Sequence, residues 1–214
     1  MIMGIIFDLD GTLLNTIADI ARVTNYALVK NGFPPHDVNS YASMVGHGLK
    51  DLVTQALPEN TSQIANQNVY DTLIQEYMKN PVQDSILYPG ITDLLENLAI
   101  KKIPMAVLSN KLHEITEKIV VNIFKDWGFV SVFGARNGIP KKPSPVTAIA
   151  ISKTMSIQPE NILFVGDSEA DIITAKACGM RPIGVSWGYR SIEQLRKSGA
   201  EDIVNTPLEL LNYL

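Results

Sequence analysis

Five short apolar runs, each followed by turn residues, constrain the fold of this chain most strongly. They are Ile5–Phe7, Pro104–Leu108, Phe129–Phe133, Ile162–Val165 and Pro182–Val185. The runs are continuous rather than alternating, so they predict strands buried on both faces, as in a parallel sheet. Helix-like segments separate the later runs, at residues 92–101, 112–124, 146–155 and 169–178. This alternation predicts a doubly wound, Rossmann-like α/β fold with right-handed crossovers.

The stretch between the first two runs has a different character. Residues from about Thr16 to Ser85 contain no convincing strand. Within them, five apolar residues follow the spacing of an amphipathic helix: Leu49, Leu52, Val53, Ala56 and Leu57. The length of 214 residues fits one domain of about 150 residues with a smaller insert. We expect an α/β core domain formed by residues 1–15 and 86–214, and a helical cap domain of residues 16–85 inserted after the first strand.

Composition and charge exclude several classes of protein. The formal net charge is −4, and no run of like charges provides the basic footprint of a nucleic-acid or anionic-membrane binder. No apolar stretch approaches the ~18 residues of a membrane span, and the first residues lack the pattern of a signal peptide. Cys178 is the single cysteine, which fits a reducing compartment. We therefore expect a cytoplasmic protein without nucleic-acid or membrane partners, as a monomer or homodimer.

Two aspartates, Asp8 and Asp10, directly follow the first apolar run. Open parallel sheets bind ligands beyond the carboxyl ends of their strands, so we expect the functional site here. Two such carboxylates can divide the roles of nucleophile and proton donor, and their repulsion favours a hard cation such as Mg²⁺. Taken alone, the pair is also compatible with a solvated acidic turn. A calcium loop fits poorly, because it needs acidic residues at alternate positions and glycine at the sixth.

Three further segments place polar residues after predicted strands. Ser109 and Asn110 follow the second run, where they could bind phosphoryl oxygens or cap a helix. Asp167 follows the fourth run, and Asp171 lies one helical turn later, close enough to support the same cation or to act in helix capping. Lys142 precedes a stiff proline-containing segment and could neutralise a phosphate, although a lone Lys-Pro is also typical of a solvated loop.

Together these segments resemble a known family. Asp8–Leu13, Leu108–Lys111, Lys142–Pro145 and Gly166–Asp171 resemble, in order, the four motifs of the haloacid dehalogenase superfamily, and they bracket about four-fifths of the chain. The helical insert resembles the cap of that superfamily. Segments 44–52, 88–90 and 185–189 are most similar to its phosphoglycolate phosphatase branch. One departure is Asn15-Thr16, where many relatives carry Asp-Ser or Asp-Thr, and it bears on the electrostatics of the cap hinge.

The resemblance implies a mechanism and a set of site residues. Asp8 would attack phosphorus to form an aspartyl-phosphate, and Asp10 would protonate the leaving group and then activate water. Mg²⁺ would be held by Asp8, the backbone carbonyl of Asp10 and Asp167, with support from Asp171. The phosphoryl oxygens would be bound by Thr12, Ser109, Asn110 and Lys142.

Two other functions stay open beside the phosphatase. The Asp10 carboxylate favours phosphate esters over the substrates of dehalogenases and phosphonate hydrolases, which lack it. It does not separate a phosphatase from a sugar-phosphate mutase of the β-phosphoglucomutase kind. A non-catalytic phosphoacceptor module is also doubly wound, but it is shorter and has no helical cap after the first strand.

The expected substrate is a small phosphorylated metabolite, phosphoglycolate or a similar phosphate ester. His47 and Lys50 of the predicted cap, and Arg136 of the core, are the candidates for contact with the leaving group. Each has a structural alternative: a histidine in a glycine turn, a solvated lysine at a helix start, and an arginine that faces solvent.

Overall fold

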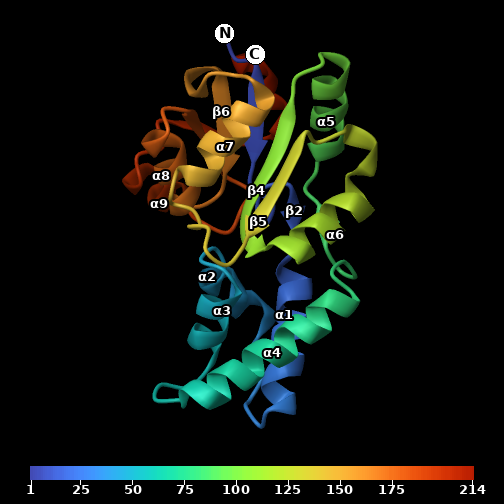
Figure 1. Ribbon diagram of the computed structural model, residues 1–214, viewed down its shortest axis with the longest axis vertical. Coiled ribbons are helices and arrows are strands. Elements are labelled where there is room, and N and C mark those ends of the chain that lie inside the picture. The colour runs from blue at the N-terminus through green and yellow to red at the C-terminus, as the bar shows by residue number, and fades with distance from the viewer.

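The computed structural model describes residues 1–214 and contains a six-stranded parallel sheet between two layers of helices (Figure 1). The strand order is β5-β4-β1-β6-β7-β8. The strands are β1 (Gly4–Phe7), β4 (Met105–Leu112), β5 (Ser131–Ala135), β6 (Ile162–Gly166), β7 (Arg181–Val185) and β8 (Asp202–Val204). The chain order reverses on either side of β1, so the carboxyl ends of β4, β1 and β6 meet at a topological switch point. The predicted doubly wound parallel fold is confirmed.

Alternate residues of β1 are buried on opposite faces of the sheet. Five helices cover these faces: α5 (Ile91–Ile100), α6 (His113–Ile123), α7 (Val146–Met155), α8 (Glu169–Ala177) and α9 (Ile192–Lys197). Ile5 and Phe7 belong to the larger core cluster with residues of α5 and α6. Ile6 belongs to a second cluster with residues of α7 and α8. Figure 1 shows these helix pairs on opposite sides of the sheet, which explains why the strands lack alternating polarity.

Three strands differ from the prediction by more than one residue. The strand expected at 129–133 begins two residues later, because Gly128 ends the preceding turn in the left-handed region (φ 59°) and Phe129 packs edge-on against Phe124. The edge strand β8 was not predicted, since Asp202–Val204 is only three residues long and begins with an acidic residue.

The strands expected at 5–7, 162–165 and 182–185 form with one further residue each. The strand expected at 104–108 is longer than predicted: β4 continues to Leu112 with a shift of register after Leu108, because its pairing with β5 resumes at Leu112. Ser109 and Asn110, predicted to follow this strand, therefore lie within it.

Residues 17–79 form a group of helices that lies below the sheet in Figure 1. The helices are α1 (Ile17–Lys30), α2 (Tyr41–Met44), α3 (Leu49–Ala56) and α4 (Gln63–Lys79). The helix expected around Leu49 is α3, and its predicted apolar face is buried. A short antiparallel pair, β2 (Leu14–Asn15) and β3 (Ile86–Leu87), joins the two chain connections to the core. The division into two domains at 15/16 and 85/86 stays a prediction.

The Asp19 carboxylate fastens these two connections to each other. Asp19 is fully buried in the first turns of α1. Its oxygens accept hydrogen bonds from the backbone N–H groups of Gln83, Asp84 and Ser85, from the Ser85 hydroxyl at 2.6 Å, and from Arg22 at 2.7 Å. Burial alone would raise the pKa of this carboxyl, but the donors, led by Ser85 and Arg22, hold it below its usual value. The ionised form is therefore the one that the fold stabilises.

We expect Asp19→Asn to destabilise the protein by about 2–3 kcal/mol, because an amide supplies one acceptor oxygen where two are used and leaves buried N–H groups without a partner. The lowered pKa means that wild-type stability from Asp19 is present above about pH 4 and is lost as pH falls through the folded-state value. Thermal unfolding of both proteins at pH 7 and pH 3.5 measures this. If Asp19→Asn lowers the Tm as much at pH 3.5 as at pH 7, this expectation is contradicted.

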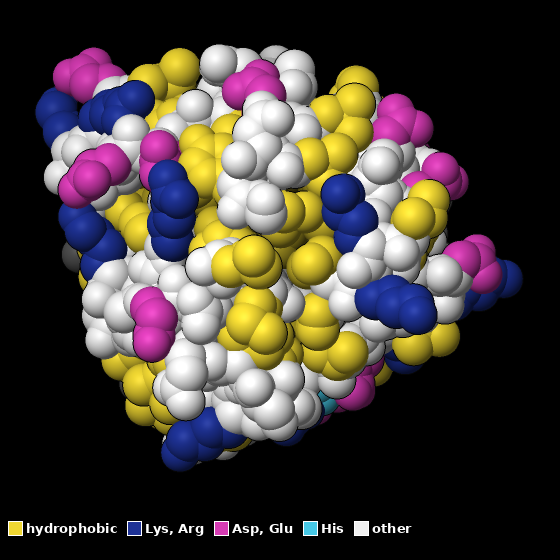
Figure 2. All heavy atoms as spheres, turned by 90° about the horizontal axis from the view of Figure 1, so that it is seen from above, with side chains coloured by type: hydrophobic (Ala, Val, Ile, Leu, Met, Phe, Trp, Pro, Cys, Tyr) yellow, Lys and Arg dark blue, Asp and Glu magenta, His cyan; other side chains and the backbone are white.

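The surface carries charges of both signs. Figure 2, seen from the end that holds the chain termini, shows basic and acidic side chains spread around hydrophobic ones, without a continuous basic area on that face. None of the helices has the length and apolar character that a membrane span requires.

Candidate active site

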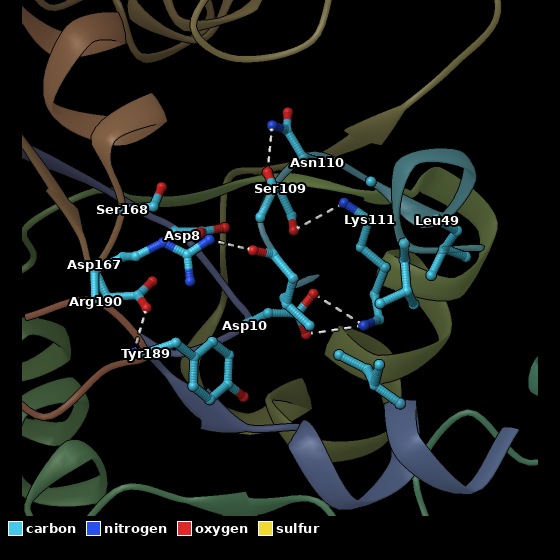
Figure 3. Close-up of a pocket in the computed structure, with 15 residues that line it drawn as sticks. Asp8, Asp10, Leu49, Ser109, Asn110, Lys111, Asp167, Ser168, Tyr189 and Arg190 are labelled. Carbon is cyan, nitrogen blue, oxygen red and sulfur yellow. Dashed lines mark hydrogen bonds and ion pairs between the residues drawn. The ribbon is translucent and has the colours of Figure 1, made fainter. Parts of the chain in front are cut away.

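Four segments at the carboxyl edge of the sheet meet the helices of residues 17–79 around one pocket (Figure 3). The core contributes the ends of β1, β4 and β6 and the loop after β7. Of the sequence-predicted site residues, Asp8, Asp10, Ser109, Asn110 and Asp167 line this pocket. Outside the lining, Thr12 contacts Asp167, Lys142 contacts Asp8, and Asp171 contacts Lys142. The structure therefore brings the residues of all four motifs together.

Three buried carboxylates and one ammonium group form the centre of the site. The carboxylates of Asp8, Asp167 and Asp171 lie within 4.8 Å of one another. The Lys142 ammonium donates to Asp171 at 2.6 Å and lies 2.9 Å from Asp8. All four side chains are at most a tenth exposed. When all are ionised, the group carries an excess of two negative charges, which matches one divalent cation with hard oxygen ligands.

The pKa values of these side chains reflect the same excess of negative charge. Burial, together with the neighbouring Asp171 and Asp167, raises the pKa of Asp8 well above its usual value. Burial and Asp171 raise the pKa of Asp167 to about 7. Burial alone would lower the pKa of Lys142, but Asp171 and Asp8 raise it, so this lysine stays charged. A divalent cation bound by these carboxylates would lower the pKa values of Asp8 and Asp167 again.

Two glycines allow the backbone to approach Asp167 closely. A Cβ atom on Gly11 would lie 2.3 Å from the Asp167 carboxylate, and Gly11 has a φ of +85°. A Cβ on Gly188 would lie 2.1 Å from the Asp167 Cβ. The Tyr189 N–H donates to the same carboxylate at 2.7 Å, and the Thr12 hydroxyl donates at 3.3 Å. Asp167 is therefore held by loops from two different strands.

The Asp10 carboxylate lies apart from this acidic group. Both of its oxygens accept hydrogen bonds from Lys111 at 2.9 Å, drawn in Figure 3 on the opposite side of the pocket from Asp167. The Thr16 hydroxyl donates to Asp10 at 2.7 Å. Lys111 is only 1% exposed, and its ammonium lies 4.8 Å from the centre of the Tyr77 ring of α4. Burial would lower the pKa of Lys111, but Asp10 and Tyr77 raise it. The two strand-end aspartates thus have separate basic partners.

Core side chains hold the loop between α2 and α3 through its backbone carbonyls. The Asn110 amide donates to the Gly46 carbonyl at 2.9 Å, and also pairs with the backbone of Lys142. Lys141 donates to the His47 carbonyl. Arg190 donates to the carbonyls of Ala42 and Val45. We define the docking loop as residues 42–48, which comprise the last residues of α2 and the connection to α3, and which cover the pocket.

The pocket under the docking loop is small. It offers about 30 Å³ to the centres of water molecules, room for about two waters. The helical segment contributes a largely apolar wall, and the core contributes the polar groups. The lining residues are Asp8, Asp10, Ile20, Val45, Gly46, Gly48, Leu49, Leu52, Ser109, Asn110, Lys111, Asp167, Ser168, Tyr189 and Arg190. The structure is therefore that of a closed site.

The three residues expected to contact the leaving group lie outside this lining. Lys50 and Arg136 line a neighbouring open cleft of about 690 Å³, together with Tyr70 and Lys141. His47 is exposed and contacts the core through its backbone carbonyl. Direct contact of these side chains with substrate stays a prediction.

Three pocket residues were not singled out from the sequence. Lys111 belongs to the second motif, and its position just past a predicted strand is a signal that could have identified it. Tyr189 and Arg190 follow the strand β7 in the same way. Their contacts with Thr16, Asp167 and the docking loop join segments far apart in the chain, so the sequence pattern contains no sign of them.

The comparisons with known proteins agree with this geometry. Residues 5–185 match the family model described as haloacid dehalogenase-like hydrolase. The chain belongs to this family. It is similar to the phosphoglycolate phosphatase of Chromobacterium violaceum, with 30% identity over 100% of this chain and 96% of that protein. It is also similar to the phosphoglycolate phosphatase of Aquifex aeolicus, with 31% identity over 86% of this chain and 85% of the relative.

A solved structure gives the same result. The crystal structure of a candidate phosphoglycolate phosphatase from Lactobacillus delbrueckii subsp. bulgaricus superposes with a TM-score of 0.92 at 31% identity, covering 99% of this chain and 97% of the other. This member of the haloacid dehalogenase-like family is thus a hydrolase similar to phosphoglycolate phosphatases over its full length. The resemblance read from the four motifs is confirmed.

The raised pKa of Asp167 leads to a pH-dependent response to metal. Without metal, a carboxyl whose folded-state pKa is about 7 gives its full stability below the unfolded value of about 4, and loses it as pH rises through 7. Mg²⁺ competes with these protons. We expect the rise in Tm on adding Mg²⁺ to be several degrees larger at pH 8 than at pH 5.5, measured against EDTA. Asp167→Asn should remove most of this difference, and an equal Mg²⁺ effect at both pH values in the wild type would contradict it.

Proposed function

We propose that the chain is a Mg²⁺-dependent phosphomonoester hydrolase that acts through an aspartyl-phosphate on Asp8. The observation that carries this proposal is the separation of two strand-end aspartates. Asp8 lies in the acidic group with Lys142 at 2.9 Å, while Asp10 is held by Lys111 and Thr16. This separation supports a division of roles, with Asp8 as the nucleophile and Asp10 as the group that transfers protons.

The Mg²⁺ site is supported by the charge and chemistry of the residues present. Asp8 and Asp167 would hold the ion with the backbone carbonyl of Asp10, and Asp171 would support it. A bound Mg²⁺ supplies positive charge that neutralises the phosphoryl oxygens and the nucleophile. Asp171 has a second task, because it accepts the Ser168 backbone and hydroxyl hydrogen bonds that cap α8.

In the first step an Asp8 carboxylate oxygen attacks phosphorus. The bond from phosphorus to the ester oxygen breaks, and the electron pair leaves with that oxygen, which takes a proton from Asp10. Lys142, beside Asp8, stabilises the negative charge of the phosphoryl group, and Ser109 of β4 offers it a hydroxyl donor. Thr12 and Asn110 were predicted to bind phosphoryl oxygens too. Their side chains are directed to Asp167 and to backbone groups, so we propose that they hold the loops that do so.

In the second step Asp10 accepts a proton from water, and the water oxygen attacks phosphorus. The bond between phosphorus and Asp8 breaks, which releases inorganic phosphate and restores both carboxylates to their starting states. The closed docking loop excludes bulk water from the first step.

We propose phosphoglycolate, or a phosphate ester of similar size, as the substrate. The names of the similar proteins support this proposal. A sugar leaving group carries several hydroxyls that need polar partners when buried. The wall of the pocket that faces the phosphoryl site offers Ile20, Val45, Leu49 and Leu52 instead. This favours a short leaving group and hydrolysis over a sugar-phosphate mutase.

The roles of Asp8 and Asp10 can be separated with p-nitrophenyl phosphate, whose leaving group needs no proton. Asp8→Asn should lower turnover at least ~10³-fold, because no nucleophile remains. Asp10→Asn should release about one equivalent of nitrophenolate in a burst and then stall, because the aspartyl-phosphate is not hydrolysed. Stopped-flow absorbance with Mg²⁺ measures both.

EDTA should abolish turnover by the wild type in the same assay. Unchanged Tm values would show that the variants are folded. Turnover by Asp8→Asn equal to that of the wild type would refute the nucleophile, and steady turnover by Asp10→Asn without a burst would refute the acid–base role.

A substrate panel tests the leaving group. We expect kcat/KM for phosphoglycolate to exceed that for glucose 6-phosphate and nucleoside monophosphates by about 10-fold or more, because the helical side of the pocket offers apolar side chains to their hydroxyls. Incubation with β-glucose 1-phosphate should release phosphate slowly and form no glucose 6-phosphate. Isomerisation without release of phosphate would establish the mutase, and equal rates across the panel would remove phosphoglycolate as the substrate while leaving the hydrolase.

A further inference from the structure

The pocket contains one basic group that is not paired with a catalytic carboxylate. Lys111 is held by both oxygens of Asp10, and Lys142 by Asp8 and Asp171. Arg190 lines the pocket and is only 9% exposed. Its single ionic partner is Glu169, whose carboxylate lies 3.4 Å from Nε and is one third exposed. Figure 3 shows the Arg190 side chain extending from its loop toward the middle of the pocket.

The guanidinium group of Arg190 has more N–H donors than its contacts with the docking loop use. One terminal nitrogen donates to the Ala42 carbonyl at 2.7 Å, and the other donates to the Val45 carbonyl. Each terminal nitrogen of a guanidinium carries two hydrogens, so each retains one further N–H. A planar pair of N–H groups matches the geometry of a carboxylate. The retained donors can therefore bind an anion while the contacts with the docking loop persist.

The apolar character of the opposite wall means that a negatively charged leaving group in this pocket depends on Arg190 for a partner of opposite charge. The wall opposite the phosphoryl site is built from apolar side chains of the helical segment, among them Leu49 and Leu52. A carboxylate enclosed there loses its water and needs a charged partner. Lys50 and Arg136, in the neighbouring cleft, do not line the pocket.

We propose that Arg190 is the specificity-determining residue for a leaving group that carries a carboxylate. The inference rests on the proposed phosphatase function and names the group that recognises its substrate. Because the same guanidinium binds the docking loop, a carboxylate in the pocket adds to the contacts that keep the loop closed. A substrate without the carboxylate leaves a buried positive charge incompletely paired, which disfavours it.

The test compares two substrates that differ at one group, 2-phosphoglycolate and 2-hydroxyethyl phosphate. In wild-type enzyme with Mg²⁺ the carboxylate substrate should have the higher kcat/KM. In Arg190→Gln, kcat/KM for phosphoglycolate should fall about 10- to 100-fold more than kcat/KM for hydroxyethyl phosphate. Arg190→Lys keeps the charge without the planar fork and should lie between the two. The readout is the ratio of kcat/KM for the two substrates, because loss of the docking-loop contacts alone lowers both kcat/KM values equally.

Two arginine variants serve as comparisons. Arg181→Gln removes a surface arginine of β7 paired with Asp202, and it should leave the substrate ratio unchanged. Arg136→Gln removes the arginine of the neighbouring cleft. Selective loss of phosphoglycolate turnover in Arg136→Gln instead of the Arg190 variants would overturn the assignment.

Other outcomes separate this inference from the proposed function. Equal losses for both substrates in Arg190→Gln and Arg190→Lys would overturn the specificity role, as would a wild type that hydrolyses both substrates equally. Both results leave the phosphatase intact. Absence of hydrolysis of either substrate by the wild type with Mg²⁺ would refute the proposed function itself. Arg190→Gln could have a Tm well below that of the wild type. In that case calorimetry replaces the kinetic test and measures the affinity for phosphoglycolate of two folded variants, Asp8→Asn and Asp8→Asn/Arg190→Lys. Equal affinities of these two variants would overturn the proposal.

Discussion

The repulsion between Asp8, Asp167 and Asp171 is the constraint that organises the rest of this structure. Three carboxylates within 4.8 Å of one another, with one lysine among them, are unfavourable in a buried place unless positive charge arrives. The chain tolerates this arrangement by surrounding the carboxylates with donors from several strands, including the Tyr189 N–H and the Ser168 hydroxyl. The parallel sheet makes it possible, since it brings strand ends that are distant in sequence to one edge.

The docking of the helical segment depends on the same loops as the chemistry. Asn110, Lys141 and Arg190, which hold the docking loop, are the immediate neighbours of Ser109, Lys142 and Tyr189. A movement of one of these segments would therefore change both the position of the proposed catalytic groups and the closure of the site. Gly46 and Gly48 fit this arrangement: a Cβ on Gly46 would lie 3.2 Å from Arg190, and one on Gly48 would lie 3.1 Å from the Asn110 carbonyl oxygen.

Much of the fold could be predicted from the sequence, because its signals are local. Continuous apolar runs such as Ile162–Val165 identify strands buried on both faces, and strand-end polar residues such as Asp8 and Asp167 indicate where a ligand binds. The register of β5 and the short strand β8 depend on packing and edge pairing, which leave little local signal. The same holds for the pocket: Lys111 follows a recognisable strand, whereas the contacts of Arg190 with Ala42 and Val45 arise only when two distant segments meet. A positive residue on the predicted cap, such as Lys50, proved a poor guide to the lining of the pocket.

The Asp19 carboxylate has a mechanical consequence. It ties the start of α1 to residues 83–85, so the outgoing and returning chains are joined beside the β2–β3 pair rather than free to move independently. Two connecting segments joined side by side can bend together about a common axis, but they resist twisting about each other. A helical segment held in this way would keep one orientation relative to the strand ends if it swung away, so that the docking loop would meet the same three core residues again on closing.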